Sequence, residues 1–152
     1  MNIKLLLCGL LALSVSACAQ LQTNKQSNQT VIEQPQVAEL KQGVPIYFES
    51  NSSNIEQKFI DYLSVASQEL AKNKSFVLLV EGHTDNRGSI ASNNRISLER
   101  ATTVRNILVM QYHVDPKQIV VAGYGASKPI ADNATREGQA LNRRVLLTLK
   151  IK

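Results

Sequence analysis

The stretch VEGHTDNRGSIASNNRISLERA, at residues 80–101, places an acidic loop between an apolar run and a helical pattern. At 100° per residue, Ile96, Val104 and Ile107 fall on one stripe of a helix, with Leu108 at its margin. Such a stripe predicts a helix that packs one side against a hydrophobic core. The segment therefore sets the spacing between the preceding strand, its loop and this helix.

Polar residues occupy the same stripe. Asn93 and Arg100 lie on the side that the apolar spacing directs inward. A guanidinium in a core-facing position is costly unless an anion meets it. That anion is either an internal carboxylate, for which Asp85 is the obvious candidate, or the carboxylate of a ligand. The function of the chain depends on which of the two is correct.

The composition indicates one domain with a tail. The chain has 152 residues, of which 43% are hydrophobic and 19% charged, with 17 basic against 12 acidic residues. This length suits a single core. The basic residues are spread along the chain and aromatic residues are few, so we expect no nucleic-acid partner. A bias of this size is compatible with an acidic polymer or an anionic surface.

The N-terminus has the plan of a secretory signal. Lys4 precedes the apolar run LLLCGLLALSV, and small residues follow it. The exit VSAC resembles the bacterial lipobox, so we expect residues 1–17 to be a lipoprotein signal peptide. Cys18 would then carry the lipid (palmitate among its acyl chains). The alternative is ordinary cleavage beside an unrelated cysteine.

Cleavage after residue 17 would remove Cys8 and leave Cys18 as the remaining cysteine. The mature domain would then have no disulfide and no cysteine metal site. Ala19 stands where an aspartate is the usual inner-membrane retention signal, so the resemblance to lipoproteins points to the outer membrane.

Residues 18–42 are rich in Gln, Asn, Ser and Thr without a sustained apolar period, which indicates a flexible tether behind the lipidated cysteine. A short helix around Val37–Leu40 is left open. The domain is expected over residues 43–152. It should contain strands near 46–48, 75–80, 119–121 and 142–151, with helices over 55–71 and 90–112.

This order, β-α-β-α-β-loop-β, predicts an α/β fold of two layers. Right-handed crossovers would place both helices on one face of a mixed sheet, to which the last strand adds antiparallel. Residues 127–138 are expected to form a loop.

Several motifs occur in a fixed order. They are Gly82-His83-Thr84-Asp85, Gly88, the run Asn93 to Ala101, Gly123-Tyr124-Gly125, Pro129 and Asn142-Arg143-Arg144-Val145. Together they resemble the OmpA-like peptidoglycan-binding domain over residues 46–151. With the lipobox and the tether, the layout is similar to that of Pal-like lipoproteins.

The resemblance implies a site for the diaminopimelate of the peptidoglycan stem peptide. This ligand carries an ammonium and a carboxylate on one carbon. By motif match, Asp85 would take the ammonium and Arg100 the carboxylate. Asn93 would hydrogen-bond near that pair, and Asn51 is expected in the turn after the first strand.

Further ligand contacts and supports are implied around this pair. Backbone N–H groups from Thr84 to Asn86 are expected to serve the carboxylate. Either Arg143 or Arg144 is expected to support the site, and Asn142 its loop. Gln139 stands where family members often have arginine, which predicts weaker binding of whatever that arginine contacts.

Two other interpretations of these residues stay open beside ligand binding. Asp85 and Arg100 could form an internal salt bridge that holds the loop to the helix. His83, which begins a His-x-Asp sequence, invites a metal interpretation, but no other histidine or cysteine supports it. We expect a structural role for His83 and neither a metal nor a cofactor.

The sequence thus predicts a non-enzymatic lipoprotein that links the outer membrane, on its periplasmic face, to peptidoglycan. One alternative is an interaction module that binds periplasmic proteins of a Tol-Pal-like complex. A cell-wall hydrolase is less favoured, because a lone His-x-Asp supplies no nucleophile with its base. A flagellar-stator-like role is disfavoured, because no transmembrane helix is expected beyond the signal.

Overall fold

Short runs of mostly apolar residues build the strands of the domain. The structure, a computed structural model, describes residues 35–50, 52 and 55–152. In chain order the elements are α1 (Pro35–Gln42), β1 (Val44–Tyr47), the 3-10 helix η1 (Gln57–Phe59), α2 (Ile60–Lys72), β2 (Phe76–Gly82), α3 (Ile90–Met110), the 3-10 helix η2 (Pro116–Gln118), β3 (Ile119–Gly123), α4 (Arg136–Asn142) and β4 (Arg144–Ile151).

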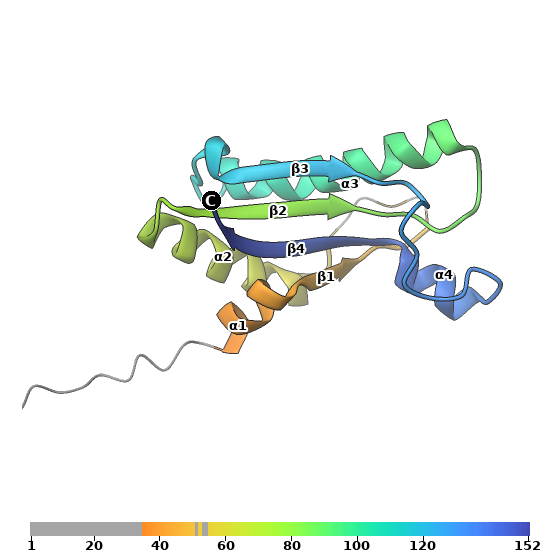
Figure 1. Cartoon of the computed structure of the whole chain (residues 1–152), viewed down its shortest axis with the longest axis horizontal. Coiled ribbons are helices and arrows are strands. Elements are labelled where there is room, and N and C mark those ends of the chain that lie inside the picture. The colour runs from red at the N-terminus through yellow and green to blue at the C-terminus, as the bar shows by residue number, and fades with distance from the viewer. Residues whose placement is uncertain (1–34, 51, 53–54) are drawn as a thin grey trace, which may run out of the picture. The chain divides into compact units, whose positions relative to one another are not determined.

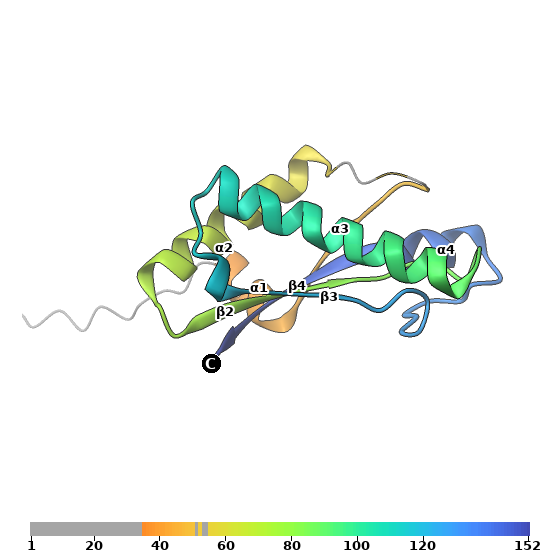
Figure 2. The ribbon, with the colours of Figure 1, turned by 90° about the horizontal axis from the view of Figure 1, so that it is seen from above.

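The described strands form one mixed sheet in the order β1-β4-β2-β3 (Figure 1). β4 lies between β1 and β2 and runs antiparallel to both, whereas β2 and β3 are parallel. Helices α2 and α3 cover the same face of this sheet (Figure 2). The predicted two-layer α/β fold, with both long helices on one face and the last strand antiparallel, is confirmed.

The strand registers bring four chain segments to one end of the sheet. Gly82 of β2 pairs with Gly123 of β3 and with Val145 of β4, and Tyr47 of β1 pairs with Arg144 of β4. β1, β2 and β3 therefore end where β4 begins. The loops that follow the first three strands meet the residues that precede the fourth, and the candidate site is built there.

The core lies between the sheet and the two long helices. Its fully buried members come from both layers: Leu63, Ala66 and Leu70 of α2, Val104 and Leu108 of α3, Leu78 and Val80 of β2, and Leu147 and Leu149 of β4. The inward stripe of α3 is rotated slightly from the predicted one. Leu108 is fully buried, while Ile96 and Ile107 are only half-buried.

Two glycines allow α3 to lie close against the sheet. A Cβ atom at Gly82 would overlap the backbone carbonyl of Ser97 in α3. A Cβ at Gly123 would lie 2.7 Å from the backbone nitrogen of Leu98. Real Cβ atoms do not approach backbone so closely, so any larger residue would push the helix outward. These contacts fix the distance from α3 to the loop after β2.

The N-terminal boundary differs from the prediction. The last part of the expected tether, residues 18–42, forms α1, so the short helix left open around Val37–Leu40 is present, with both of these residues buried. α1 packs on β4 and α2, and the Tyr62 hydroxyl donates a 2.5 Å hydrogen bond to Glu39. Two apolar residues in a polar stretch give little local signal, so the helix depends on these tertiary contacts. The signal peptide, Cys18 and the rest of the tether lie outside the described residues.

A second difference concerns the stretch before β4. Residues 136–142, expected to be loop and the start of the last strand, form α4. Its N-cap is Thr135, whose hydroxyl accepts a 3.0 Å hydrogen bond from the Gly138 backbone. Gly138 packs against the backbone of Asp132, a position where a Cβ would clash. The glycine serves packing here, although in the sequence it reads as a loop residue.

We expect Leu40→Ala to destabilise the domain by about 2–5 kcal/mol, because it empties a fully buried site between α1 and the sheet. Urea unfolding followed by circular dichroism measures the change. Gln36→Ala, at an exposed position of the same helix, is the control. An unchanged midpoint for Leu40→Ala would contradict the packing of α1 described here.

Candidate functional site

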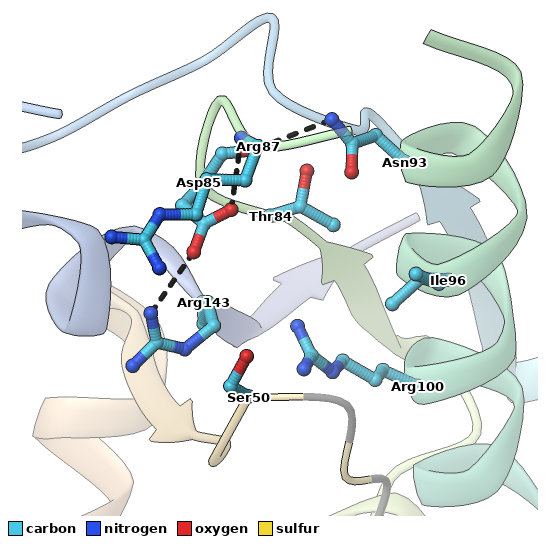
Figure 3. A pocket seen from close by; sticks show the side chains of 8 residues that line it. All are labelled: Ser50, Thr84, Asp85, Arg87, Asn93, Ile96, Arg100 and Arg143. Carbon is cyan, nitrogen blue, oxygen red and sulfur yellow. Dashed lines mark hydrogen bonds and ion pairs between the residues drawn. The ribbon is translucent and has the colours of Figure 1, made fainter. Parts of the chain in front are cut away.

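A pocket lies at the end of the sheet where the loops meet (Figure 3). The space between its lining residues is about 370 Å³, part of which is open solvent. Its lining comes from the loop after β1, the loop after β2, the inner face of α3 and the residue before β4: Ser50, Thr84, Asp85, Arg87, Asn93, Ile96, Arg100 and Arg143. The pocket thus combines side chains far apart in the sequence, and most of them are polar.

Arg100 is the largest of the fully buried side chains, with 2% of its surface exposed. Its Nε donates to the backbone carbonyl of Ser52 at 3.1 Å, and its Nη2 donates to that of Glu49 at 3.0 Å. The guanidinium also lies 5.1 Å from the ring centre of Phe48. The loop after β1 therefore holds the arginine in place.

The remaining guanidinium nitrogen of Arg100, Nη1, is buried without a hydrogen-bond partner. Burial, followed by the neighbouring positive charge of Arg143, lowers the pKa of Arg100, while Asp85 opposes that effect. A guanidinium nevertheless stays protonated in proteins. Arg100 lines the pocket and carries an unsatisfied cationic donor, which favours an anionic ligand.

Asp85 pairs with Arg143 and not with Arg100. The Arg143 Nη1 lies 3.0 Å from the Asp85 Oδ2, and both side chains are largely buried. Within the described residues no ion pair joins Asp85 to Arg100, so the direct salt bridge considered from the sequence is wrong. The Asp85 Oδ1 accepts a 3.1 Å hydrogen bond from the Arg87 backbone, which fixes the carboxylate in its loop.

Thr84 and Asn93 also reach the pocket, and Asn86 does not. The Thr84 hydroxyl is buried without a partner. The Asn93 side-chain amide donates a weak 3.4 Å hydrogen bond to the Asp85 backbone carbonyl. Asn86 lies outside the lining, and its backbone N–H bonds the Asn133 side chain at 3.2 Å. Asn51 lies outside the described residues.

Of the two arginines that could support the site, the structure places Arg143 in it. Besides its bond to Asp85, Arg143 donates from Nε to the Phe48 carbonyl at 3.3 Å. Arg144 is buried and donates to the carbonyls of Asn142 and Lys128 instead. Arg143 thus connects the loops after β1 and β2, whereas Arg144 supports the segment after β3.

Asn142 holds the neighbouring loop through a set of hydrogen bonds. Its side-chain oxygen accepts from the Ile130 and Ala131 backbones, at 2.8 and 3.1 Å. Its side-chain nitrogen donates to the Ala131 carbonyl and the Asn133 side chain, both at 2.9 Å. Gln139, at the position where family members often have arginine, donates to the Asn133 carbonyl at 2.7 Å. In this chain Gln139 therefore serves the loop itself.

His83 is buried next to the pocket and is not one of its lining residues. Its ring stacks on Tyr124 at 5.6 Å between centres, and neither ring nitrogen has a hydrogen-bond partner. Burial, with the nearby charges of Arg144 and Lys128, lowers the pKa of His83 to about 4. In the part of the chain that the structure describes, no three side chains of metal-binding type gather into a site.

The sequence interpretation missed Arg87, Ser50 and Ile96 as lining residues. Arg87 follows Asp85 by two positions in the same loop, and that proximity was the available signal. The pairing of Asp85 with Arg143 had no local signal, because it depends on how β4 enters the sheet beside β1.

Comparison with known proteins identifies the family. Residues 47–143 match the OmpA family, and this range holds every lining residue of the pocket. The chain belongs to the OmpA family. Membership rests on a match that covers more than half of the chain.

Curated relatives include Omp38 of Acinetobacter baumannii, 37% identical over 78% of this chain. The chain spans only 34% of the length of Omp38, about a third. The peptidoglycan-associated lipoprotein of Pseudomonas putida is 36% identical over 72% of this chain and 65% of that protein.

Solved structures with the same fold include the peptidoglycan-associated lipoprotein of Burkholderia pseudomallei. It matches with a TM-score of 0.66 and 27% identity, over 70% of this chain and 89% of that one. The C-terminal domain of Helicobacter pylori MotB matches with a TM-score of 0.63 and 30% identity, over 72% of this chain and 85% of that one. Across the described ranges of our chain, none of the helices has the length and apolar character needed to span a bilayer.

Acid should destabilise the domain through His83. Because its pKa falls from 6.5 in the unfolded chain to about 4 in the folded one, its contribution is complete above pH 6.5. That contribution is lost as the pH falls from 6.5 toward 4, by about 2–3 kcal/mol. Urea unfolding at pH 7 and pH 4.5 should show a smaller loss for His83→Phe, which keeps the stack on Tyr124.

His113→Asn is the control for that experiment, since His113 lies just beyond α3, with a positive φ of 55° that asparagine tolerates. It should keep the wild-type dependence on pH. Equal losses in wild type and His83→Phe would show that His83 is not the group responsible.

Proposed function

We propose that this chain binds peptidoglycan non-covalently and without catalysis, and that its pocket holds the diaminopimelate of the stem peptide. Membership of the OmpA family supports this, as do relatives whose names call them peptidoglycan-associated. The observation that carries the proposal is the Arg100 guanidinium, buried with a free Nη1 in a pocket that also presents Asp85.

The charges suit a zwitterion. Diaminopimelate offers an ammonium and a carboxylate on one carbon. The free Nη1 of Arg100 would donate to the carboxylate, and the Asp85 carboxylate would accept from the ammonium. Because Asp85 pairs with Arg143, the ligand can enter between Asp85 and Arg100 without breaking a bond between them.

Both groups are held before the ligand arrives. Arg100 is fixed by two backbone carbonyls of the loop after β1, and Asp85 by Arg143 and the Arg87 backbone. Little side-chain freedom remains to be lost on binding, which favours affinity. The unpaired Thr84 hydroxyl and the Asn93 amide would add hydrogen bonds to the ligand.

The anchor belongs to the same proposal. Lipidation of Cys18 after removal of residues 1–17 would fix the chain to the outer membrane, on its periplasmic face. Each buried CH₂ of the acyl chains would contribute about 0.8 kcal/mol. Residues 19–34 would then join the lipid to α1 over at most about 55 Å. Together with the pocket, this anchor would connect the membrane to the cell wall.

Binding of periplasmic proteins of a Tol-like complex stays a prediction from the family. Competition separates the two functions. A soluble stem peptide should release the domain from peptidoglycan if the pocket is used there. A protein partner that is displaced by the same peptide would share the pocket with the cell wall.

We expect Asp85→Asn and Arg100→Gln to weaken binding to purified peptidoglycan sacculi at least about tenfold, because each removes one charge-assisted contact with the ligand. The measurement is a pull-down of residues 19–152 across protein concentrations, with folding checked by circular dichroism. Arg100→Ala is less suitable, because it would also leave a cavity beside Phe48.

Asp61→Asn is the matched control, since Asp61 is exposed in the first turn of α2. It should bind as wild type does. Folded Asp85→Asn and Arg100→Gln proteins that retain full binding would overturn the proposed site.

Sacculi that contain lysine in place of diaminopimelate should bind at least about tenfold more weakly than diaminopimelate sacculi. Lysine has the ammonium but lacks the carboxylate that Arg100 would hold. Pull-downs on the two kinds of wall measure the ratio. Equal binding would show that the carboxylate is not recognised.

A further inference from the structure

The pocket has more positive charge than a zwitterion needs. Among the lining residues that the structure describes, three are arginines, Arg87, Arg100 and Arg143, and Asp85 is the one carboxylate. The other lining residues, Ser50, Thr84, Asn93 and Ile96, are uncharged. Two positive charges are therefore left in excess, and a bound zwitterion brings no net charge to offset them. A ligand with a second negative charge would fit this pocket better.

The three arginines are not equally available. Arg143 is bound to Asp85 and to the Phe48 carbonyl. Arg100 is bound to two carbonyls and keeps one free nitrogen, which the proposed function uses. The Arg87 side chain is exposed and makes no hydrogen bond or ion pair within the described residues. Arg87 is thus the cation that remains for a further anionic group.

The position of Arg87 sets where that group would lie. Its backbone is tied to the Asp85 carboxylate, the group that would hold the ligand ammonium. Figure 3 shows the Arg87 side chain on the Asp85 and Arg143 side of the pocket, opposite Arg100. A carboxylate at Arg87 would therefore be separated from the one at Arg100, as the two ends of an extended ligand are.

We propose that Arg87 binds a second carboxylate of the same stem peptide, the one at its C-terminal end. This inference rests on the proposed function. When the terminal carboxyl of a stem donates a crosslink it becomes an amide and loses its charge. The site would accordingly select stems whose terminal carboxyl is free, and Arg87 is the residue that determines this specificity.

The effect should be modest, because an exposed ion pair is weakened by water and by salt. We expect a stem tetrapeptide with a free terminal carboxylate to bind about fivefold more tightly than its terminal carboxamide. The ratio should shrink as the salt concentration rises. Diaminopimelate stays intact in both peptides, so the comparison isolates the terminal charge.

The experiment is calorimetric titration of residues 19–152 with the tetrapeptide L-Ala-γ-D-Glu-meso-diaminopimelate-D-Ala and with its C-terminal carboxamide. Arg87→Gln should bring the affinity ratio of the two peptides close to one, because it removes the partner of the terminal carboxylate. Arg95→Gln is the matched control, because Arg95 is an exposed arginine of α3 outside the pocket lining. It should keep the wild-type ratio.

A wild-type ratio near one, or a ratio that survives in Arg87→Gln, overturns the role of Arg87. A third peptide, with lysine in place of diaminopimelate, reports on the proposed function separately. If that peptide binds as tightly as the tetrapeptide, the diaminopimelate site itself fails. If no peptide binds wild-type protein, both proposals fail together.

Discussion

The buried guanidinium of Arg100 is the group on which the site depends. A charge removed from water is costly, and here the cost is met only in part, by the carbonyls of Glu49 and Ser52 and by the Phe48 ring. The loop after β1 covers Arg100, and its backbone carbonyls accept the hydrogen bonds of the guanidinium. One nitrogen is left without any. A domain with this pocket gains stability from a carboxylate that reaches it, which links the fold directly to ligand binding.

The sheet makes this arrangement possible. β1, β2 and β3 end where β4 begins, so Asp85 and Arg143 meet although they belong to distant parts of the sequence. Gly82 lets α3 lie close enough to bring Arg100 over the same end. In the absence of ligand, Asp85 forms its ion pair with Arg143. Asp85 therefore does not occupy the Arg100 guanidinium, which stays available to a ligand carboxylate. Through its side chain, Asn142 holds the loop of Ile130 and Ala131 beside the site.

Much of the fold followed from the sequence, because long apolar periods and strand order determine a two-layer sheet. Of the two short helices, α1 is only left open by the sequence around Val37–Leu40, and α4 is expected as loop and strand. α1 has only Val37 and Leu40 to bury, and α4 contains Gly138, so neither shows a local pattern and both depend on tertiary contacts. Arg100 could be placed in the core from its stripe alone. Its actual partners are backbone carbonyls, which no side-chain pattern reveals.

Other parts of the site illustrate the same limit. The pairing of Asp85 with Arg143 depends on strand register, and the approach of Arg87 to the pocket depends on the path of its loop. Asn51 and Cys18 lie outside the described residues, so their roles stay predictions. The family motifs indicate the position of the pocket, but which charges face it and which neutralise one another depends on the three-dimensional packing of these segments.

The most direct test of the central claim is a crystal structure of residues 19–152 with a stem peptide that contains meso-diaminopimelate. The account predicts the ligand carboxylate on the Nη1 of Arg100 and the ammonium on Asp85, with the carbonyl bonds of Arg100 kept. A peptide bound elsewhere, or a ligand in the pocket that leaves the Nη1 of Arg100 without a partner, would contradict it.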